Sequence, residues 1–354
     1  MPFIQLTGPQ TIAMQKALLA AFPQEANFRN VLILANKTLD GVSGVGQPLP
    51  TRILEAIKNA EANNWLLDLL SAAVASNEHD ETLNSLHDDL KVRVPPPDLS
   101  PYYMCRLGGG TVMVDRKPLR AAVEELHDLQ GRRIFVIKGE SWCGKSHSLQ
   151  LITFIAQIVG GFTVVPVDLD PRRDDQTRLV LGARDLASRL VSLSGYNITL
   201  PEDPTDRQWS RWVTTFGDRF AESAIQERDA RWIVIDGMNK VLLDQSAVDL
   251  IQDLVNRVHS ALARLRLVLV GYEQSLPPLV LPYIQEEQVA RISNDDLVEF
   301  FVLAYQEMNK PRDEDALAEV VARILNQVDM TSIDYLVKLG PLVAQEVLKI
   351  KRGS

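Results

Sequence analysis

The segment 139–146, GESWCGKS, constrains the fold of this chain more than any other. It matches the pattern G-x-x-x-x-G-K-[S/T] at every fixed position. The apolar run before it, residues 133–138, predicts a buried strand, and residues 148–158 predict a helix because they contain no Gly or Pro. A glycine-rich loop between a strand and a helix binds phosphate through its backbone N–H groups and the helix N-terminus. We therefore expect an α/β nucleotide-binding domain around this loop.

A second apolar strand carries the acid that such a site needs. Residues 231–236 read as a buried apolar strand that ends in an acid, Asp236, which is typical of a Walker B segment. We expect Lys145 to reach the β- and γ-phosphates of the nucleotide. The Ser146 hydroxyl would bind Mg²⁺ directly and Asp236 would hold it through water. ATP is the expected nucleotide, because no guanine-specificity signature stands where one would be needed.

Composition and charge exclude several other classes of protein. The chain of 354 residues has a net charge of −9, which argues against a nucleic-acid partner bound through overall charge. Only two cysteines occur, and Cys143 lies inside the phosphate loop, so we expect no structural disulfide and a location in the reducing cytoplasm. The start of the chain lacks a basic segment followed by an apolar core, so we expect no secretory signal. No apolar run reaches membrane-spanning length, and we expect no membrane partner.

The first quarter of the chain predicts a separate, all-helical bundle. Apolar residues recur at helical spacing over residues 7–22, 26–39, 51–63 and 65–75. A Gly/Pro-rich stretch at 41–50 separates the second helix from the third. Short breaks of this kind between helices are typical of a compact bundle.

Particular apolar, aromatic and proline positions of these helices form a specific pattern: Leu18, Ala21, Phe22, Pro23, Leu32, Ile57, the turn 60–65, Leu66, Leu69 and Leu70. With this pattern the helices resemble the effector-associated domain of the first type, a bacterial adaptor module likened to death-fold domains. The resemblance implies that residues 1–89 pair with a like domain on an effector protein such as a protease. The alternative is a helical cap that packs on the following domain and regulates it.

Residues 90–110 predict a linker. Three consecutive prolines, Pro95–Pro97, favour a stiff polyproline II spacer, and three glycines at 108–110 restore flexibility. The segment is either a hinge between the bundle and the next domain or a stretch that packs along that domain, since Tyr102 and Met104 are apolar enough to dock.

Residues 112–126, VMVDRKPLRAAVEEL, resemble the entry segment of STAND-type and related AAA-like ATPases. The resemblance implies that Asp115 and Arg116 lie near the adenine or the ribose; the alternative is a helix cap and a surface arginine. It also implies a nucleotide-binding core over residues 111–292 and a helical lid over 293–354. Three helical segments without a following repeat array fit such a lid.

The chain departs from these relatives directly after Asp236. STAND-type proteins usually carry a further acid here, which orients or deprotonates the attacking water, whereas this chain reads GMNK over residues 237–240. Asn239 can still hold a water by hydrogen bonding, so we assign catalytic roles to Lys145, Asp236 and Asn239. Loss of a positioned base typically lowers a rate by about 10²–10⁴-fold, so we expect slow or absent hydrolysis. More distant candidates for a base are Glu140, Asp244 and Glu273.

Polar residues around the strand expected at 265–270 complete the predicted site. The resemblance places a polar sensor at the end of that strand, where Tyr272 and Gln274 are the candidates. Arg291 is either a phosphate sensor or a solvated side chain. Arg266, near the start of the strand, is expected at the surface.

Together these features predict an α/β P-loop NTPase with a parallel sheet and a C-terminal helical lid, preceded by a small death-fold-like helical bundle. The expected function is an ATP-binding switch that recruits an effector in bacterial defence, with nucleotide-dependent homo-oligomers as one form of assembly. Two alternatives stay open: an AAA-type ATPase that remodels a protein partner, and a scaffold that binds nucleotide without turnover. The expected nucleotide contacts are Asp115, Arg116, Gly139, Glu140, Ser141, Trp142, Cys143, Gly144, Lys145, Ser146 and His147.

Overall fold

The chain forms two compact units. The first consists of Met1–Val112 with the short segments Gln157–Gly160 and Glu307–Asn309, and the second comprises the rest. The computed structural model describes residues 6, 8–63, 65–92, 99–107, 111–114, 116–129, 131–140, 142–169, 179–204, 208–311 and 314–352. Two expected nucleotide contacts, Asp115 and Ser141, lie outside these described residues.

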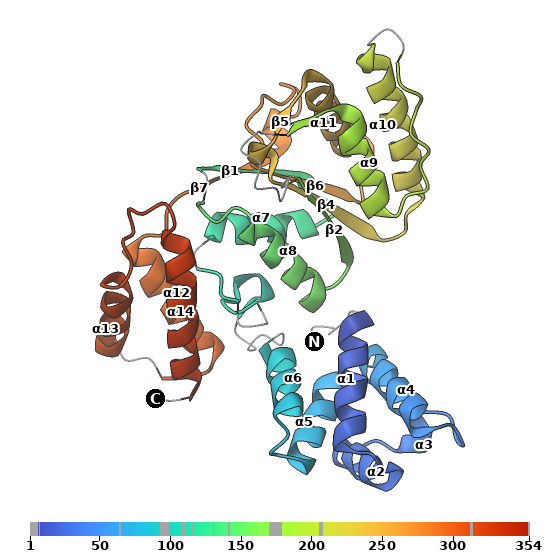
Figure 1. Ribbon diagram of the computed structural model, residues 1–354, viewed down its shortest axis with the longest axis vertical. Coiled ribbons are helices and arrows are strands. Elements are labelled where there is room, and N and C mark those ends of the chain that lie inside the picture. Colours follow the sequence, from blue (N-terminus) through green and yellow to red (C-terminus); the bar gives the residue numbers. More distant parts are fainter. Residues whose placement is uncertain are drawn as a thin grey trace. The chain divides into compact units, whose positions relative to one another are not determined.

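Helices dominate the described part of the first unit (Figure 1). They are α1 (Gly8–Ala21), α2 (Glu25–Leu34), α3 (Leu39–Val42), α4 (Leu49–Ala62), α5 (Leu66–Ser76) and α6 (Glu81–Val92). Their apolar faces share one core, in which Leu18, Phe28, Ile57 and Leu70 are fully buried. The predicted all-helical bundle is confirmed.

The second predicted helix is shorter than expected. Helix α2 ends at Leu34 rather than continuing to Leu39, because Asn36 takes a left-handed backbone with φ of 56° and starts a turn. Ala35 and Leu39 are both buried, on either side of this turn. Buried apolar residues thus occur both before and after the turn at Asn36, so their spacing in the sequence suggested one continuous helix.

The described part of the expected linker is packed. Residues Pro101–Tyr103 form a short 3₁₀ helix, and Arg106 makes an antiparallel bridge with Val112. The buried carboxylate of Glu307 accepts hydrogen bonds from the Cys105 N–H at 2.7 Å and from Arg106 Nε at 2.6 Å. These contacts join the described part of the segment to Glu307 within the first unit, while the prolines and glycines at 95–97 and 108–110 lie outside the described residues.

A five-stranded parallel sheet organises the second unit, as the sequence predicts. Its strands run in the order β2-β4-β6-β1-β7. They are β1 (Ile134–Gly139), β2 (Phe162–Asp168), β4 (Ala230–Asp236), β6 (Leu265–Val270) and β7 (Ile284–Val289). Strand β6 thus separates β1, which leads into the phosphate loop, from β4, which ends in Asp236. A separate parallel pair joins β3 (Val180–Leu181) to β5 (Leu242–Leu243).

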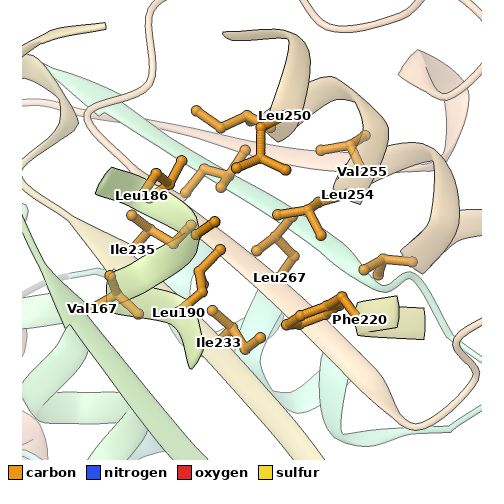
Figure 2. Packing of buried hydrophobic residues seen from close by; sticks show 14 of the residues in the cluster. Val167, Leu186, Leu190, Phe220, Ile233, Ile235, Leu250, Leu254, Val255 and Leu267 are labelled. Carbon is orange, nitrogen blue, oxygen red and sulfur yellow. The ribbon is translucent and has the colours of Figure 1, made fainter. Parts of the chain in front are cut away.

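Helices cover both faces of the sheet (Figure 1). One face carries α7 (Lys117–His127) and α8 (His147–Ile158), and the other carries α9 (Ala183–Ser194), α10 (Trp209–Gln226) and α11 (Gln245–Ser260). Figure 2 shows sheet side chains meeting those of the latter three helices: Val167, Ile233, Ile235 and Leu267 with Leu186, Leu190, Phe220, Leu250, Leu254 and Val255. Burial on both faces explains why these strands read as continuous apolar runs.

Arg266 is wholly buried, so its expected position at the surface was wrong. Its guanidinium donates hydrogen bonds to the carbonyl oxygens of Leu126 at 2.7 Å and Asp128 at 3.0 Å, at the C-terminal end of α7. Burial lowers the pKa of Arg266 to about 10, and the positive charge of Arg133 adds to the effect. A cation at a helix C-terminus satisfies carbonyl groups that the helix itself leaves without donors.

The edge strand β7 was not expected from the sequence. Its residues read IQEEQV, with too few apolar positions to suggest a strand, yet Ile284, Glu287 and Val289 are buried. Three helices follow in the region expected to form the lid: α12 (Asn294–Glu307), α13 (Glu314–Leu325) and α14 (Tyr335–Arg352). No helix in the described part of the chain is long and apolar enough to span a membrane.

Candidate nucleotide-binding site

The phosphate loop joins the end of β1 to the start of α8, and its two glycines are fixed by geometry. Gly139 has φ of 145°, and a Cβ there would lie 2.8 Å from the Val289 carbonyl oxygen and 2.9 Å from Cys143 Sγ. Gly144 has φ of 91°, and a Cβ there would lie 3.1 Å from Leu336 Cδ1. A side chain at either position would strain the backbone; at Gly139 it would also collide with the Val289 backbone, and at Gly144 it would crowd the Leu336 side chain.

Lys145 is buried against the beginning of its own loop. Its ammonium donates a hydrogen bond to the Gly139 carbonyl oxygen at 2.6 Å and another to the Glu140 carbonyl oxygen. Cys143 Sγ lies 3.7 Å from Lys145 Nζ, and the Cys143 side chain is buried. Trp142, by contrast, is 65% exposed and has a left-handed backbone with φ of 65°. The Lys145 ammonium is thus buried against the loop, whereas the Trp142 side chain faces solvent.

Asp236 ends β4 at the same edge of the sheet as the phosphate loop. Strands β1, β6 and β4 are parallel neighbours, so their carboxyl ends meet at one edge, where α/β sheets bind ligands. The Asp236 side chain is buried, and its Oδ1 accepts a hydrogen bond from the Gly237 N–H at 2.7 Å. Ser146, at the end of the loop, is exposed.

The residues present fit a magnesium ion bound together with phosphate. Mg²⁺ prefers oxygen ligands and keeps several waters, so one hydroxyl and one carboxylate at a sheet edge suffice when phosphates supply the rest. Ser146 and Asp236, the two ligands expected from the sequence, would be those groups. In the described residues there is no cluster of three or more His, Cys, Asp or Glu side chains suited to a metal.

Asn239 lies beside the end of the central strand β6. It belongs to the 3₁₀ turn Met238–Lys240 that follows Asp236, and its side chain is half-buried. The neighbouring Gly271 has φ of 79°, and a Cβ there would lie 2.6 Å from the Asn239 amide oxygen. Asn239 therefore packs on the backbone of Gly271 and brings an amide to the edge where Asp236 ends.

Of the more distant acids, Asp244 has a structural task. It is the N-cap of α11, and its carboxylate accepts hydrogen bonds from the Ala247 N–H at 2.9 Å and the Ser246 hydroxyl at 2.7 Å. Glu140 and Glu273 are exposed.

Tyr272, one of the two sensor candidates, is part of the apolar core. Its side chain is fully buried, and among the described residues its hydroxyl has no hydrogen-bond partner. Burial raises the pKa of Tyr272 to about 12, with a contribution from the Asp249 carboxylate. Gln274, the other candidate, is exposed.

We expect Tyr272→Phe to stabilise the protein by about 1 kcal/mol at neutral pH, because it removes a buried hydroxyl without a partner. Because the pKa of Tyr272 is raised from 10 to about 12, deprotonation favours the unfolded chain, so the free energy of unfolding of wild type falls further below that of Tyr272→Phe as the pH rises from 10 toward 12. Urea denaturation and ultraviolet titration of tyrosinate would measure both effects. Tyr283→Phe is the control, since Tyr283 is 52% exposed. A loss of stability or of ATP affinity in Tyr272→Phe would instead indicate that the hydroxyl acts in the site.

Arg116 is buried next to the phosphate loop. Its guanidinium forms a two-point ion pair with Glu287 of β7, with both nitrogen–oxygen distances at 2.7 Å. It also donates to the Ser148 hydroxyl at 2.6 Å and to the Gly144 carbonyl oxygen at 3.2 Å. Burial lowers the pKa of the adjacent His147 below its usual value, and the positive charge of Arg116 adds to this.

The start of α14 lies against the same loop. Leu336 faces Gly144, and the Tyr335 hydroxyl accepts a hydrogen bond from the Ile292 N–H at 3.2 Å. Arg291 lies over the Tyr335 ring and donates to the carbonyl oxygens of Met330 at 2.9 Å and Ser332 at 3.3 Å. In this structure Arg291 thus holds the loop before α14.

Sequence reasoning missed several neighbours of the loop. Glu287, Tyr335 and Leu336 come from segments far along the chain and fit no motif. Of these three residues, only Glu287 offered a local signal in the sequence, because an acid at a buried strand position interrupts the apolar alternation. Of the expected contacts that the structure describes, it brings Arg116, Cys143, Gly144 and Lys145 into one cluster.

Residues 4–91 match the family model of effector-associated domain 1. The first part of the chain is therefore similar to the family that its helices were expected to resemble. No curated protein matches the chain.

Several solved structures resemble the chain loosely. A Walker-type ATPase of Pyrococcus abyssi is 15% identical with a TM-score of 0.33, over 68% of this chain and 73% of that one. PCH-2 of C. elegans is 11% identical with a TM-score of 0.33, over 68% and 70% of the two chains. The E. coli MS115-1 HORMA:CdnC:Trip13 complex contains a chain 13% identical with a TM-score of 0.34, over 68% and 89%.

Proposed function

We propose that this protein is an ATP-binding switch that recruits an effector protein through its N-terminal domain and hydrolyses ATP slowly or not at all. The main observation behind the proposal is that one chain contains both a segment that matches the effector-associated domain, residues 4–91, and a phosphate loop. Adaptor and nucleotide site together favour signalling over metabolism.

The geometry of the loop supports nucleotide binding. Lys145 is held at the loop that follows β1, and Asp236 stands at the same sheet edge two strands away. A magnesium ion held by Ser146 and Asp236 would neutralise charge on the phosphates when nucleotide is bound. The contacts expected from the sequence, Gly139 to His147, would then bind the phosphates.

The residues after Asp236 support slow turnover. Asn239 reaches the sheet edge where a water would attack, and an amide can orient a water but cannot take its proton. A switch benefits from this, because the bound state persists long enough to be read by a partner.

The partner is inferred from the first domain. We propose a protein that carries a like effector-associated domain, and a role in bacterial defence in the cytoplasm. Nucleotide binding would change the affinity for this partner, or promote self-assembly that presents several copies of the domain.

Single-turnover hydrolysis and ATP titration of the full chain test this function. We expect ATP to bind in the presence of Mg²⁺ and its hydrolysis to be slower than about 1 s⁻¹, the lower end of ordinary enzyme turnover. Binding to a candidate effector should differ between ATP and ADP. Faster hydrolysis would favour the remodelling ATPase, and absence of ATP binding would contradict the proposal altogether.

A further inference from the structure

Arg116 has an unusual setting for a residue next to a phosphate loop. It stands directly before α7 with a left-handed backbone, φ of 73°, which is rare for a residue with a side chain. Such strain persists only where the surrounding structure enforces it, and it often marks a functional position. In this chain, the strained backbone accompanies a side chain that is 6% exposed and faces the loop.

All three guanidinium nitrogens of Arg116 are engaged by the protein. Nε and Nη2 hold the Glu287 carboxylate, Nη2 also reaches the Ser148 hydroxyl, and Nη1 reaches the Gly144 carbonyl oxygen. The buried Glu287 neutralises the charge, so Arg116 is poorly suited to binding phosphate directly. Its remaining specific contact is with the loop backbone.

That contact fixes the direction of one peptide group. A trans peptide is planar, so the N–H of Lys145 points opposite to the carbonyl of Gly144. Arg116 holds that carbonyl at 3.2 Å, and the His147 N–H also donates to it at 3.0 Å. Because Arg116 and the His147 N–H both bind the Gly144 carbonyl oxygen, the Lys145 N–H on the other side of that peptide points away from Arg116. We infer that this is the side on which the loop would bind phosphate.

The geometry points to Arg116 as a positioning residue for the phosphate loop, with Glu287 as the group that orients it. This inference rests on the proposed nucleotide binding. Glu287 suits the task because it lies on β7 opposite Ile137 of β1, the strand that leads into the loop. The Arg116–Glu287 pair therefore connects the start of α7 with the edge strand β7. Arg116 also contacts Ser148 in the first turn of α8 and the Gly144 carbonyl oxygen of the loop.

Four variants of the full chain test the inference. Arg116→Met removes the contact but leaves Glu287 buried without a partner, so it is expected to lower both the melting temperature and ATP affinity. The double variant Arg116→Met with Glu287→Met replaces the ion pair with apolar groups, which is often neutral for stability. Glu286→Gln is the matched control, because Glu286 neighbours Glu287 but forms an exposed ion pair with Lys138. Lys145→Ala reports the loss of nucleotide binding itself.

Fluorescent ATP titration, thermal unfolding and hydrogen exchange of residues 140–147 without nucleotide are the measurements. We expect the double variant to recover most of the melting temperature and still bind ATP at least about tenfold more weakly. Exchange in the loop should be faster in it than in wild type, and Glu286→Gln should resemble wild type throughout.

If the double variant binds ATP as tightly as wild type, or its loop exchanges at the wild-type rate, Arg116 contributes stability only and the inference is wrong. Failure of wild type to bind ATP would refute the proposed function instead. The exchange measurement needs no nucleotide, so it distinguishes the two failures.

Discussion

Lys145→Ala is expected to weaken ATP binding on the order of 1,000-fold, which corresponds to about 4 kcal/mol. The ammonium is the one loop cation that the structure holds beside the loop's first carbonyls, within 2.6 Å of the Gly139 oxygen. Removing it would leave the charge of the β- and γ-phosphates without its main protein partner. Isothermal titration with ATP and Mg²⁺ measures the effect.

The fold should tolerate this change. The carbonyl partners of Lys145 belong to Gly139 and Glu140, which are half-buried and exposed, so water can replace the ammonium. Lys138→Ala is the matched control, because Lys138 lies on the same strand but pairs with Glu286 outside the loop. Normal ATP binding by Lys145→Ala, with unchanged thermal unfolding, would refute the nucleotide site.

The parts of this protein that the sequence predicts are those whose signal is local. The phosphate loop is a contiguous motif. The strand that leads into it, β1, and the strand that ends in Asp236, β4, are largely buried and so appear as apolar runs. Helix spacing in the first domain is equally local, and the match of residues 4–91 confirms its assignment. Each of these features is determined within a few turns of chain.

The parts that could not be predicted depend on partners far along the chain. Arg116 and Glu287 are 171 positions apart, and neither residue alone distinguishes a buried pair from two surface charges. Arg266 looks like a surface residue until the carbonyls at the end of α7 are placed beside it. Strand β7 lies at the edge of the sheet, where Glu286 and Gln288 are exposed, and its buried acid Glu287 is neutralised by Arg116. It therefore lacks the apolar pattern that identifies strands.

Asp236→Asn is the second substitution expected to have a large effect, and the property it changes is the magnesium dependence of ATP binding. We expect ATP binding in the presence of Mg²⁺ to weaken about 10- to 100-fold, the usual cost of losing a group that orients metal ligands. Binding without Mg²⁺ should change little, because the substitution removes charge from the metal site and leaves Lys145 in place. Titrations of ATP with and without Mg²⁺ separate the two contributions.

This substitution is conservative for the fold. An asparagine oxygen can accept the hydrogen bond that Asp236 Oδ1 receives from the Gly237 N–H at 2.7 Å, so the turn after β4 should persist. Asp168→Asn provides the control, since Asp168 ends the neighbouring strand β2 in register with Asp236 but is exposed. If both variants respond to Mg²⁺ as wild type does, Asp236 does not hold the ion. If both lose the response equally, general charge at the sheet edge, rather than this carboxylate, governs magnesium binding.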